Sequence, residues 1–287
     1  MRARGDNMGI LTENHELSDA LFSKFAALIH QNCGIFLSPQ KKVMLTARLY
    51  KRLRALELNT FEDYFHYLRR EMARELSFFI NSVTTNTTEF FREAGHFRFL
   101  KEIALPELDF HPNVSLKRVP RVWSAACATG EEPYSLAMTL FDYFDRPLFD
   151  LIATDIDTEV LNRARKGVYP ENAIANIPEP LKHRFTMKGI GKCQGYRRIV
   201  PEIRERIQFK THNFLNDADP ANQPMDIIFC RNVFIYFDTE TRRRVVRKLF
   251  RNLQPKGYLF IGYSESLSDI STDFQGIAPA VYVKKGG

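Results

Sequence analysis

Two patterns of hydrophobic residues divide the 287-residue chain. From about residue 18 to residue 80, apolar residues recur every three or four positions, which predicts amphipathic helices. Ser38 and Pro39 mark the start of one of them, because Ser caps helices and Pro is favoured in their first turn. We therefore expect a small all-α domain over residues 18–80, preceded by a tail of residues 1–17.

A different pattern follows a linker rich in Thr and Asn, residues 81–94. The predicted strands are the runs RVWSAA, DLIATDI, IQFKTHNF, DIIFCRNV, YLFIGY and AVYVKK, and helical periodicity lies between them. Strands and helices in alternation predict a doubly wound α/β domain with a mainly parallel sheet over residues 95–287. Residues 168–201 interrupt the alternation with turn glycines beside short extended runs, which indicates an inserted β-subdomain.

Composition and charge narrow the function classes only slightly. Hydrophobic residues make up 44% and charged residues 26%, as in ordinary soluble proteins. We find neither a run of about 18 apolar residues nor the apolar core of a secretory signal, so we expect a cytoplasmic protein without membrane insertion. The four cysteines and seven histidines are scattered, which predicts no metal site. A net charge of +7 fits nucleic acid, an anionic surface or an acidic protein equally well.

The segment SAACATGEEPYS, residues 124–135, holds the first candidate chemistry. Gly130 stands where the first strand turns into a helix, the place at which doubly wound folds bring a ligand to backbone amides. Glu131 and Glu132 would repel a pyrophosphate there but attract a ligand that carries an ammonium group. The alternative is that both acids only complement the helix dipole.

Acidic and amide residues end the later strands. Asp155 ends the second strand, where an acid accepts hydrogen bonds from a ribose diol, whereas Asp157 fits better as a helix N-cap. Asn213 and Asn232 end the third and fourth strands and suit an adenine edge and an amino-acid tail, although Asn is also a common turn residue. This combination fits S-adenosylmethionine, whose ammonium and sulfonium groups are both cationic.

Several long motifs in order resemble the CheR-type chemotaxis receptor glutamate O-methyltransferases. They are TTNTTEFFRE, WSAACATGEEPYS, TDIDTEVLNRARKG, FCRNVFIYFD and GYSES, and the resemblance extends from about Ser18 to Val283. It implies a helical domain, then an S-adenosylmethionine-dependent methyltransferase domain with an inserted β-subdomain. It favours Glu132 over Glu131 as the partner of the ammonium group. The implied cofactor-binding residues are Asn86, Thr88, Arg92, Glu132, Asp155, Asn213, Phe214, Arg231 and Asn232.

The reaction implied by this resemblance moves a methyl group from S-adenosylmethionine to glutamate side chains of chemoreceptor helices. The products are glutamate methyl esters and S-adenosylhomocysteine, in sensory adaptation. Because a glutamate with a pKa near 4.3 is already ionised at neutral pH, neither a general base nor a metal is expected. The catalytic candidates, Arg92 and Tyr236, would orient the acceptor carboxylate, and the rate would come from alignment and exclusion of water.

The expected partners are the receptors themselves. A basic stripe on the helix after Ser38 is the candidate receptor-binding surface, whereas we interpret the basic face of residues 239–253 as solvent-facing. The loop KGIGKCQGYRR has the length seen in relatives that tether to a receptor C-terminal peptide, which indicates β-augmentation. We expect a monomer. The residues of the stripe are Lys41, Arg48, Lys51 and Arg52.

Three other functions were weighed. A nucleic-acid methyltransferase is disfavoured because no N/D-P-P-Y/F run ends the fourth strand. An NAD-dependent oxidoreductase is disfavoured by the missing GxGxxG and by the acids at the turn. A regulatory module that binds the cofactor without catalysis would have the same pocket, and only an assay separates it.

Overall fold

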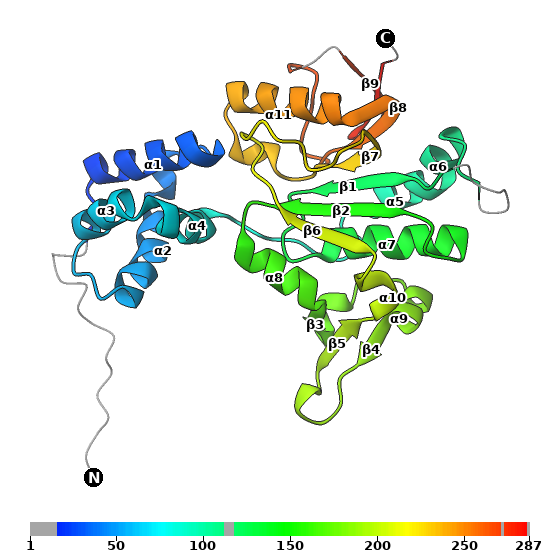
Figure 1. Cartoon of the computed structure of the whole chain (residues 1–287), viewed down its shortest axis with the longest axis horizontal. Coiled ribbons are helices and arrows are strands. Elements are labelled where there is room, and N and C mark those ends of the chain that lie inside the picture. The colour runs from blue at the N-terminus through cyan, green and yellow to red at the C-terminus, as the bar shows by residue number, and fades with distance from the viewer. Residues whose placement is uncertain (1–15, 112–117, 271–272, 286–287) are drawn as a thin grey trace. The chain divides into compact units, whose positions relative to one another are not determined.

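The chain has two compact units, Met1–Thr84 and Thr85–Gly287, drawn in Figure 1. The structure is a computed structural model and describes residues 16–111, 118–270 and 273–285. The predicted tail, residues 1–17, lies outside the described residues apart from its last two. In this division most of the predicted linker, residues 81–94, falls in the second unit.

Helices make up the first unit. The helical pattern after Thr60 forms two helices, because Glu71 leaves the helical conformation between them (φ −103°, ψ 29°). The rings of Phe25, Tyr64 and Phe79 pack together in the core, with centroids 5.6 to 6.4 Å apart. The helical segments are α1 (Asp19–Cys33), the 3-10 turn η2 (Pro39–Lys41), α2 (Lys42–Ala55), α3 (Phe61–Arg70) and α4 (Met72–Val83).

A seven-stranded sheet forms the centre of the second unit, in the order β6-β2-β1-β7-β8-β10-β9. The pairs from β6 to β8 are parallel, and β10 is antiparallel to both of its neighbours. This confirms the doubly wound α/β class, and all six predicted strands form. The bounds are β1 (Arg121–Ala125), β2 (Asp150–Asp155), β6 (Ile207–Thr211), β7 (Met225–Phe229), β8 (Leu253–Phe260), β9 (Phe274–Ala278) and β10 (Val281–Lys284).

Strand β9 was not predicted. It is an edge strand in which only Phe274 is buried, so its sequence lacks the apolar alternation that marks a strand. The central strands β1, β2 and β7, in contrast, bury both of their faces. Val122 and Ile227 join the core formed with α7, whereas Trp123 and Ile228 are buried on the other face of the sheet.

Helices cover both faces of this sheet, with α7 and α11 on opposite sides in Figure 1. The long ones are α7 (Glu131–Phe144), α8 (Thr158–Lys166) and α11 (Thr239–Asn252). The shorter segments are α5 (Gly95–Phe99), the π-helix η3 (Leu100–Ala104), α6 (Leu105–Glu107), η4 (Glu171–Ile174), α9 (Glu179–Phe185), η5 (Gly191–Cys193), α10 (Pro201–Arg204) and η6 (Phe234–Tyr236).

The predicted β-insertion is a separate three-stranded antiparallel sheet in the order β3-β5-β4. Its strands are β3 (Val168–Pro170), β4 (Thr186–Lys188) and β5 (Tyr196–Ile199), and they lie at the bottom of Figure 1. Tyr169 joins this sheet to the main one, because its hydroxyl donates to the carbonyl of Thr129 at 2.7 Å. The insertion is therefore attached to the turn after β1.

Candidate functional site

The turn between β1 and α7 is tightly bent around Gly130. Gly130 has a φ of 101°, and a Cβ at this position would lie 2.9 Å from both the Ala164 side chain and the Tyr169 hydroxyl. Ala126 and Ala128 also have positive φ values, 64° and 47°. Only glycine fits this position, and its missing side chain lets the backbone come close to a ligand at the start of α7.

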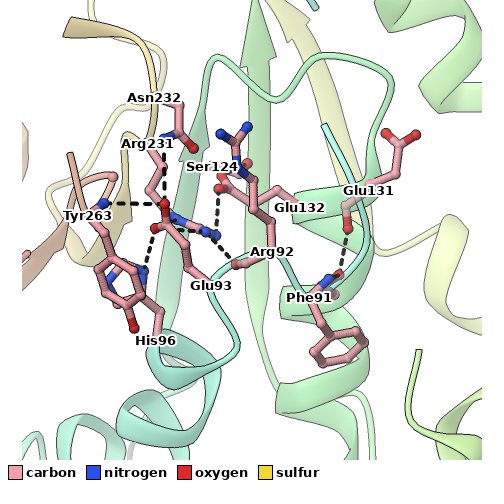
Figure 2. A network of polar contacts seen from close by, with 12 residues as sticks. Phe91, Arg92, Glu93, His96, Ser124, Glu131, Glu132, Arg231, Asn232 and Tyr263 are labelled. Atoms are coloured by element: carbon pink, nitrogen blue, oxygen red, sulfur yellow. Dashed lines mark hydrogen bonds and ion pairs between the residues drawn. The ribbon is translucent and has the colours of Figure 1, made fainter. Parts of the chain in front are cut away.

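Glu132 extends from the first turn of α7 into a polar network (Figure 2). Its carboxylate accepts a hydrogen bond from Ser124 Oγ at 2.7 Å and lies 3.2 Å from Arg231 Nη1. Burial raises the pKa of Glu132, and the charge of Arg231 opposes this. Glu131 instead accepts from the Thr129 hydroxyl at 2.7 Å and points away from the network. The two adjacent acids therefore have different environments, and Glu132 is the one in the network.

Glu93 and Arg231 form the centre of this network. Arg231 Nε and Nη2 donate to Glu93 Oε2 at 3.3 and 3.1 Å, and Nη2 also donates to the carbonyl of Arg92. Glu93 Oε1 accepts from the backbone N–H of Tyr263 at 3.2 Å and from the side-chain amide of Asn232 at 3.5 Å. One carboxylate thus joins the segment before α5 to the ends of β7 and β8 (Figure 2).

Two carboxylates share one guanidinium in this cluster. His96 Nδ1 lies 3.4 Å from Glu93, but burial lowers the pKa of His96 to about 4, so the ring is neutral at physiological pH. The nearby charge of Glu93 raises the pKa of Glu132, and the charge of Arg92 lowers it. Arg231 is divided between Glu93 and Glu132, so the hydrogen-bonded network pairs two carboxylates with one guanidinium, and a ligand ammonium group would add favourable charge there.

Asp155 lies at the carboxyl end of β2. Its carboxylate accepts from the backbone N–H of Ala128 at 2.8 Å and of Asp157 at 2.9 Å, and burial raises its pKa to about 6. A carboxylate has about four acceptor positions, so these bonds leave capacity for a ribose hydroxyl. Asp157 is the N-cap of α8, as the sequence predicts, since it accepts from the N–H of Glu159 and Val160.

The linker segment contacts the turn between β2 and α8. The amide of Asn86 donates to Asp157 Oδ2 at 2.8 Å. Thr88 is half-buried two residues further on. The guanidinium of Arg92 donates to the carbonyl of Thr87 at 3.2 Å in an exposed position. Three predicted cofactor residues, Asn86, Thr88 and Arg92, thus belong to the same compact unit as Asp155.

Asn213 and Phe214 follow β6. Asn213 Oδ1 accepts from the backbone N–H of Leu215 at 2.9 Å, which is the turn geometry typical of Asn. The ring of Phe214 packs 6.3 Å from those of Trp123 and Phe237. The turn role of Asn213 is therefore present in the structure, and its predicted contact with adenine stays a prediction.

Asn232 and Tyr236 lie in the loop between β7 and α11. Asn232 has a φ of 57°, in the left-handed region that Asn adopts more readily than most residues other than glycine. Tyr236 is half-buried in the turn η6, and its backbone N–H donates to the carbonyl of Val233 at 3.1 Å. The loop thus places a left-handed Asn next to Arg231, and α11 begins at Thr239, three residues after Tyr236.

Sequence reasoning missed the roles of Glu93 and Ser124. Both lie inside motifs that carry the resemblance, and Glu93 directly follows Arg92 in EFFRE. Nothing in the sequence relates Glu93 to Arg231, because the two are 138 positions apart. Their pairing appears only when the linker segment lies against the end of β7.

Family models match nearly all of the chain. Residues 20–84 match the model described as CheR methyltransferase, all-alpha domain, and residues 86–283 match CheR methyltransferase, SAM binding domain. The chain belongs to the CheR methyltransferase family. The resemblance stated from the motifs is therefore confirmed, and the site at the ends of β1, β2 and β7 lies in the S-adenosylmethionine-binding domain.

Curated relatives agree with this membership over most of their length. The chain is 40% identical to chemotaxis protein methyltransferase 2 of Pseudomonas aeruginosa, with 91% of each chain covered. It is also 40% identical to the chemotaxis protein methyltransferase of Escherichia coli, with 95% of this chain and 93% of the relative covered. A solved structure of the N-methyltransferase NodS from Bradyrhizobium japonicum aligns with a TM-score of 0.36 and 12% identity, covering 67% of this chain and 96% of that chain, a likeness too weak to support an inference.

Arg52 of the predicted receptor-binding stripe has an internal partner in this CheR family member. Its guanidinium donates to both oxygens of Glu75, at 2.7 and 2.6 Å. Glu75 is buried and also accepts from the hydroxyl of Tyr64 at 3.0 Å. Arg52 therefore neutralises a buried acid of the helical unit, which its sequence position on a basic stripe does not reveal.

Arg48 is engaged within the same unit, whereas the two lysines of the stripe are exposed. Arg48 Nη1 donates to the carbonyls of Val83 and Thr84, both at 2.7 Å, at the end of α4. The side chains of Lys41 and Lys51 are exposed. Of the four predicted receptor-binding residues, Lys41 and Lys51 are the two whose side chains are exposed to solvent.

The described residues hold neither a metal cluster nor a membrane-spanning helix. Among the residues that the structure describes, no group of three or more His, Cys, Asp or Glu could hold a metal ion, and the metal-free reaction stays a prediction. Over the same described ranges, no helix is long and apolar enough to cross a membrane.

Proposed function

We propose that this member of the CheR family is a protein-glutamate O-methyltransferase. It would transfer methyl groups from S-adenosylmethionine to glutamates on the cytoplasmic helices of chemoreceptors, forming methyl esters and S-adenosylhomocysteine in sensory adaptation. The observation that carries the proposal is the cluster in which Glu93 and Glu132 share Arg231, next to the Gly130 turn. This arrangement suits the ammonium group of the cofactor better than a phosphate.

The residues of the site fit the cofactor group by group. Glu132 would accept from the ammonium group, and the free acceptor positions of Asp155 would bind the ribose diol. Asn213 and Phe214 would contact the adenine, by a hydrogen bond and by stacking. The remaining proposed contacts with the cofactor are those of Asn86, Thr88, Arg92, Arg231 and Asn232.

Methyl transfer needs no proton acceptor from this chain. When bound, S-adenosylmethionine supplies an electrophilic methyl group. Glu132 and Asp155 would hold the cofactor so that this methyl group would be available to a carboxylate oxygen of the substrate glutamate. Because the acceptor glutamate is already ionised at neutral pH, the buried His96 beside the network is not needed as a base. The protein contributes alignment of the acceptor oxygen with the methyl group and exclusion of water.

Arg92 and Tyr236 are the proposed orienting residues. Arg92 would hold the acceptor carboxylate loosely, because a tight bidentate pair would weaken the oxygen as a nucleophile. Tyr236 would donate to the oxygen that does not attack. With saturating cofactor, Arg92→Ala and Tyr236→Phe should each slow transfer without adding an ionisation to the pH profile of the rate. Wild-type rates in both variants, or a new ionisation in either, would contradict this assignment.

The β-insertion offers a surface for a receptor tether. Both β3 and β4 are edge strands of its sheet, and edge strands accept an additional strand by β-augmentation. Met187, Ile190 and Tyr196 are exposed there, with Ile190 86% exposed. A peptide with the receptor C-terminal sequence should be retained by the full chain and lost when the loop of residues 188–198 is shortened; equal retention by both would remove the tether from the proposal.

The decisive experiment follows labelled methyl groups from S-adenosylmethionine to receptor cytoplasmic fragments. Label that mild base releases as methanol would establish a carboxyl methyl ester. Label found in nucleic acid, or cofactor binding without transfer, would point to a nucleic-acid methyltransferase or a regulatory module instead. We also propose that the protein is cytoplasmic and acts as a monomer. Sedimentation at working concentration tests the monomeric state.

A further inference from the structure

Glu265 lies in the segment after β8 and reaches back to the loop that follows β7. Its Oε2 accepts from the backbone N–H of Asn232 at 2.9 Å and of Gly262 at 2.6 Å, and its Oε1 accepts from the N–H of Phe234 at 2.8 Å. Its own N–H donates to the carbonyl of Gly262 at 2.9 Å. Hydrogen bonds from N–H groups to an ionised carboxylate are about twice as strong as those to a neutral acceptor.

The loop that Glu265 binds contains Asn232, whose backbone is in the left-handed region. This conformation is less costly for Asn than for most residues, but it persists only where the surrounding structure holds it. Within the loop, the turn η6 is only three residues long. The amides of Asn232 and Phe234 are held by the Glu265 carboxylate, so this one side chain sets the path of the backbone on both sides of Val233.

Gly262 completes the arrangement from the other side. A Cβ at this position would lie 2.4 Å from the side-chain nitrogen of Asn232, 3.0 Å from its backbone nitrogen and 2.9 Å from Glu265 Oε2. The backbone of Gly262 therefore packs directly against Asn232. Even a methyl group there would force Asn232 to move, without any change of charge.

We propose that Glu265 is a positioning residue for methyl transfer. Its carboxylate fixes the backbone of Asn232 and Phe234, and thereby sets where the Asn232 amide and the Tyr236 ring lie. Gly262 is required for the same reason. Burial of Glu265 raises its pKa while the backbone N–H donors oppose this, as expected for a carboxylate bound by backbone rather than by a cation. That the positioned reaction is methyl transfer rests on the proposed function, whereas the loop geometry does not.

Asp226 provides a matched control. It is a buried carboxylate at the start of β7, the opposite end of the strand from the loop. It accepts from the guanidinium of Arg118 at 2.6 and 2.7 Å and from the backbone N–H of Arg121 at 2.9 Å. Asp226→Asn should therefore lower the melting temperature without moving the loop that carries Asn232.

The experiment compares Glu265→Gln, Gly262→Ala and Asp226→Asn with wild type, all as the full chain. Three quantities are measured well below each melting temperature: amide hydrogen exchange at residues 232 and 234, affinity for S-adenosylhomocysteine, and kcat and KM for a receptor fragment. We expect Glu265→Gln and Gly262→Ala to lose protection at these amides, and to lose about tenfold or more in affinity or kcat. Asp226→Asn should stay within about twofold of wild type.

The outcomes separate this inference from the proposed function. If Glu265→Gln is less stable but matches wild type in amide protection, affinity and kcat, Glu265 serves only folding and the positioning role is wrong. If the three variants lose activity in proportion to their loss of stability, the role is equally wrong. If wild type itself neither binds S-adenosylhomocysteine nor transfers methyl groups, the proposed function fails, and amide protection still reports whether Glu265 holds the loop.

Discussion

Glu131 and Glu132 are adjacent in sequence but differ in their partners. Glu132 joins Ser124 and Arg231, whereas Glu131 accepts from Thr129. Identical side chains at neighbouring positions make a matched pair for mutation, because helix dipole and composition are the same for both. A change at Glu132 also leaves Arg231 with another carboxylate, so no buried charge is stranded.

Glu132→Gln should therefore weaken binding of S-adenosylhomocysteine by about 10- to 100-fold, the loss expected when one charged hydrogen-bond partner is removed. Glu131→Gln should change it by less than about threefold. Calorimetric titration of both variants measures this. Equal losses would show that the acids act only through the dipole of α7.

The Asp155 carboxylate should make both folding stability and cofactor affinity depend on pH. Its pKa is about 6 in the folded chain and about 3.9 when unfolded. Its contribution to folding stability is therefore fully present below about pH 3.9 and is lost as the pH rises through about 6. Ribose hydroxyls donate to the charged form of Asp155, so cofactor affinity depends on pH in the opposite direction from folding stability. The affinity should fall about tenfold per pH unit below about pH 6. Titrations with S-adenosylhomocysteine between about pH 5 and about pH 8 test this, with Asp155→Asn as the pH-insensitive control.

Helix α2 shows that a basic stripe divides into structural and exposed charges. The guanidiniums of Arg48 and Arg52 hold the end of α4 and the buried Glu75, so reversing their charge would damage the helical unit. Reversal at Lys41 and Lys51 leaves those contacts intact. These two positions therefore test receptor binding without an effect on folding.

The double variant Lys41→Glu, Lys51→Glu should lower kcat/KM for a receptor fragment by about tenfold at low salt, with a smaller loss at high salt and unchanged affinity for S-adenosylhomocysteine. The matched control is Arg243→Glu with Arg247→Glu, which removes two exposed cations from α11. The same loss in both double variants would mean that only net charge matters. A rate that does not change at low salt would remove α2 from the receptor-binding surface.

At the scale of the whole molecule, the two compact units allow binding and folding to be separated. The proposed cofactor residues all lie in Thr85–Gly287, and the helical unit has its own core. A ligand stabilises only the folded unit to which it binds. At a ligand concentration one hundred times its Kd, this stabilisation is about 2.7 kcal/mol. S-adenosylhomocysteine should therefore raise the melting transition of the second unit and leave that of the helical unit in place. Differential scanning calorimetry measures both, and an equal shift of both would contradict this separation.

The sequence by itself determined the fold class, the six strands with apolar faces and the family, because these depend on local periodicity and on motifs that are continuous in the chain. It also identified Asp157 as a helix cap, since capping joins residues two or three positions apart. The unpredicted edge strand β9 and the break at Glu71 had no such local signal.

Only the tertiary structure decided which charges meet. Arg231 pairs with Glu93 across 138 positions, Arg52 with Glu75 across 23, and Glu265 holds Asn232 across 33. An ion pair or a hydrogen bond depends on distance and burial, and one sequence gives neither for residues far apart in the chain. For that reason the sequence named the residue types of the site, and the fold decided which of them act together.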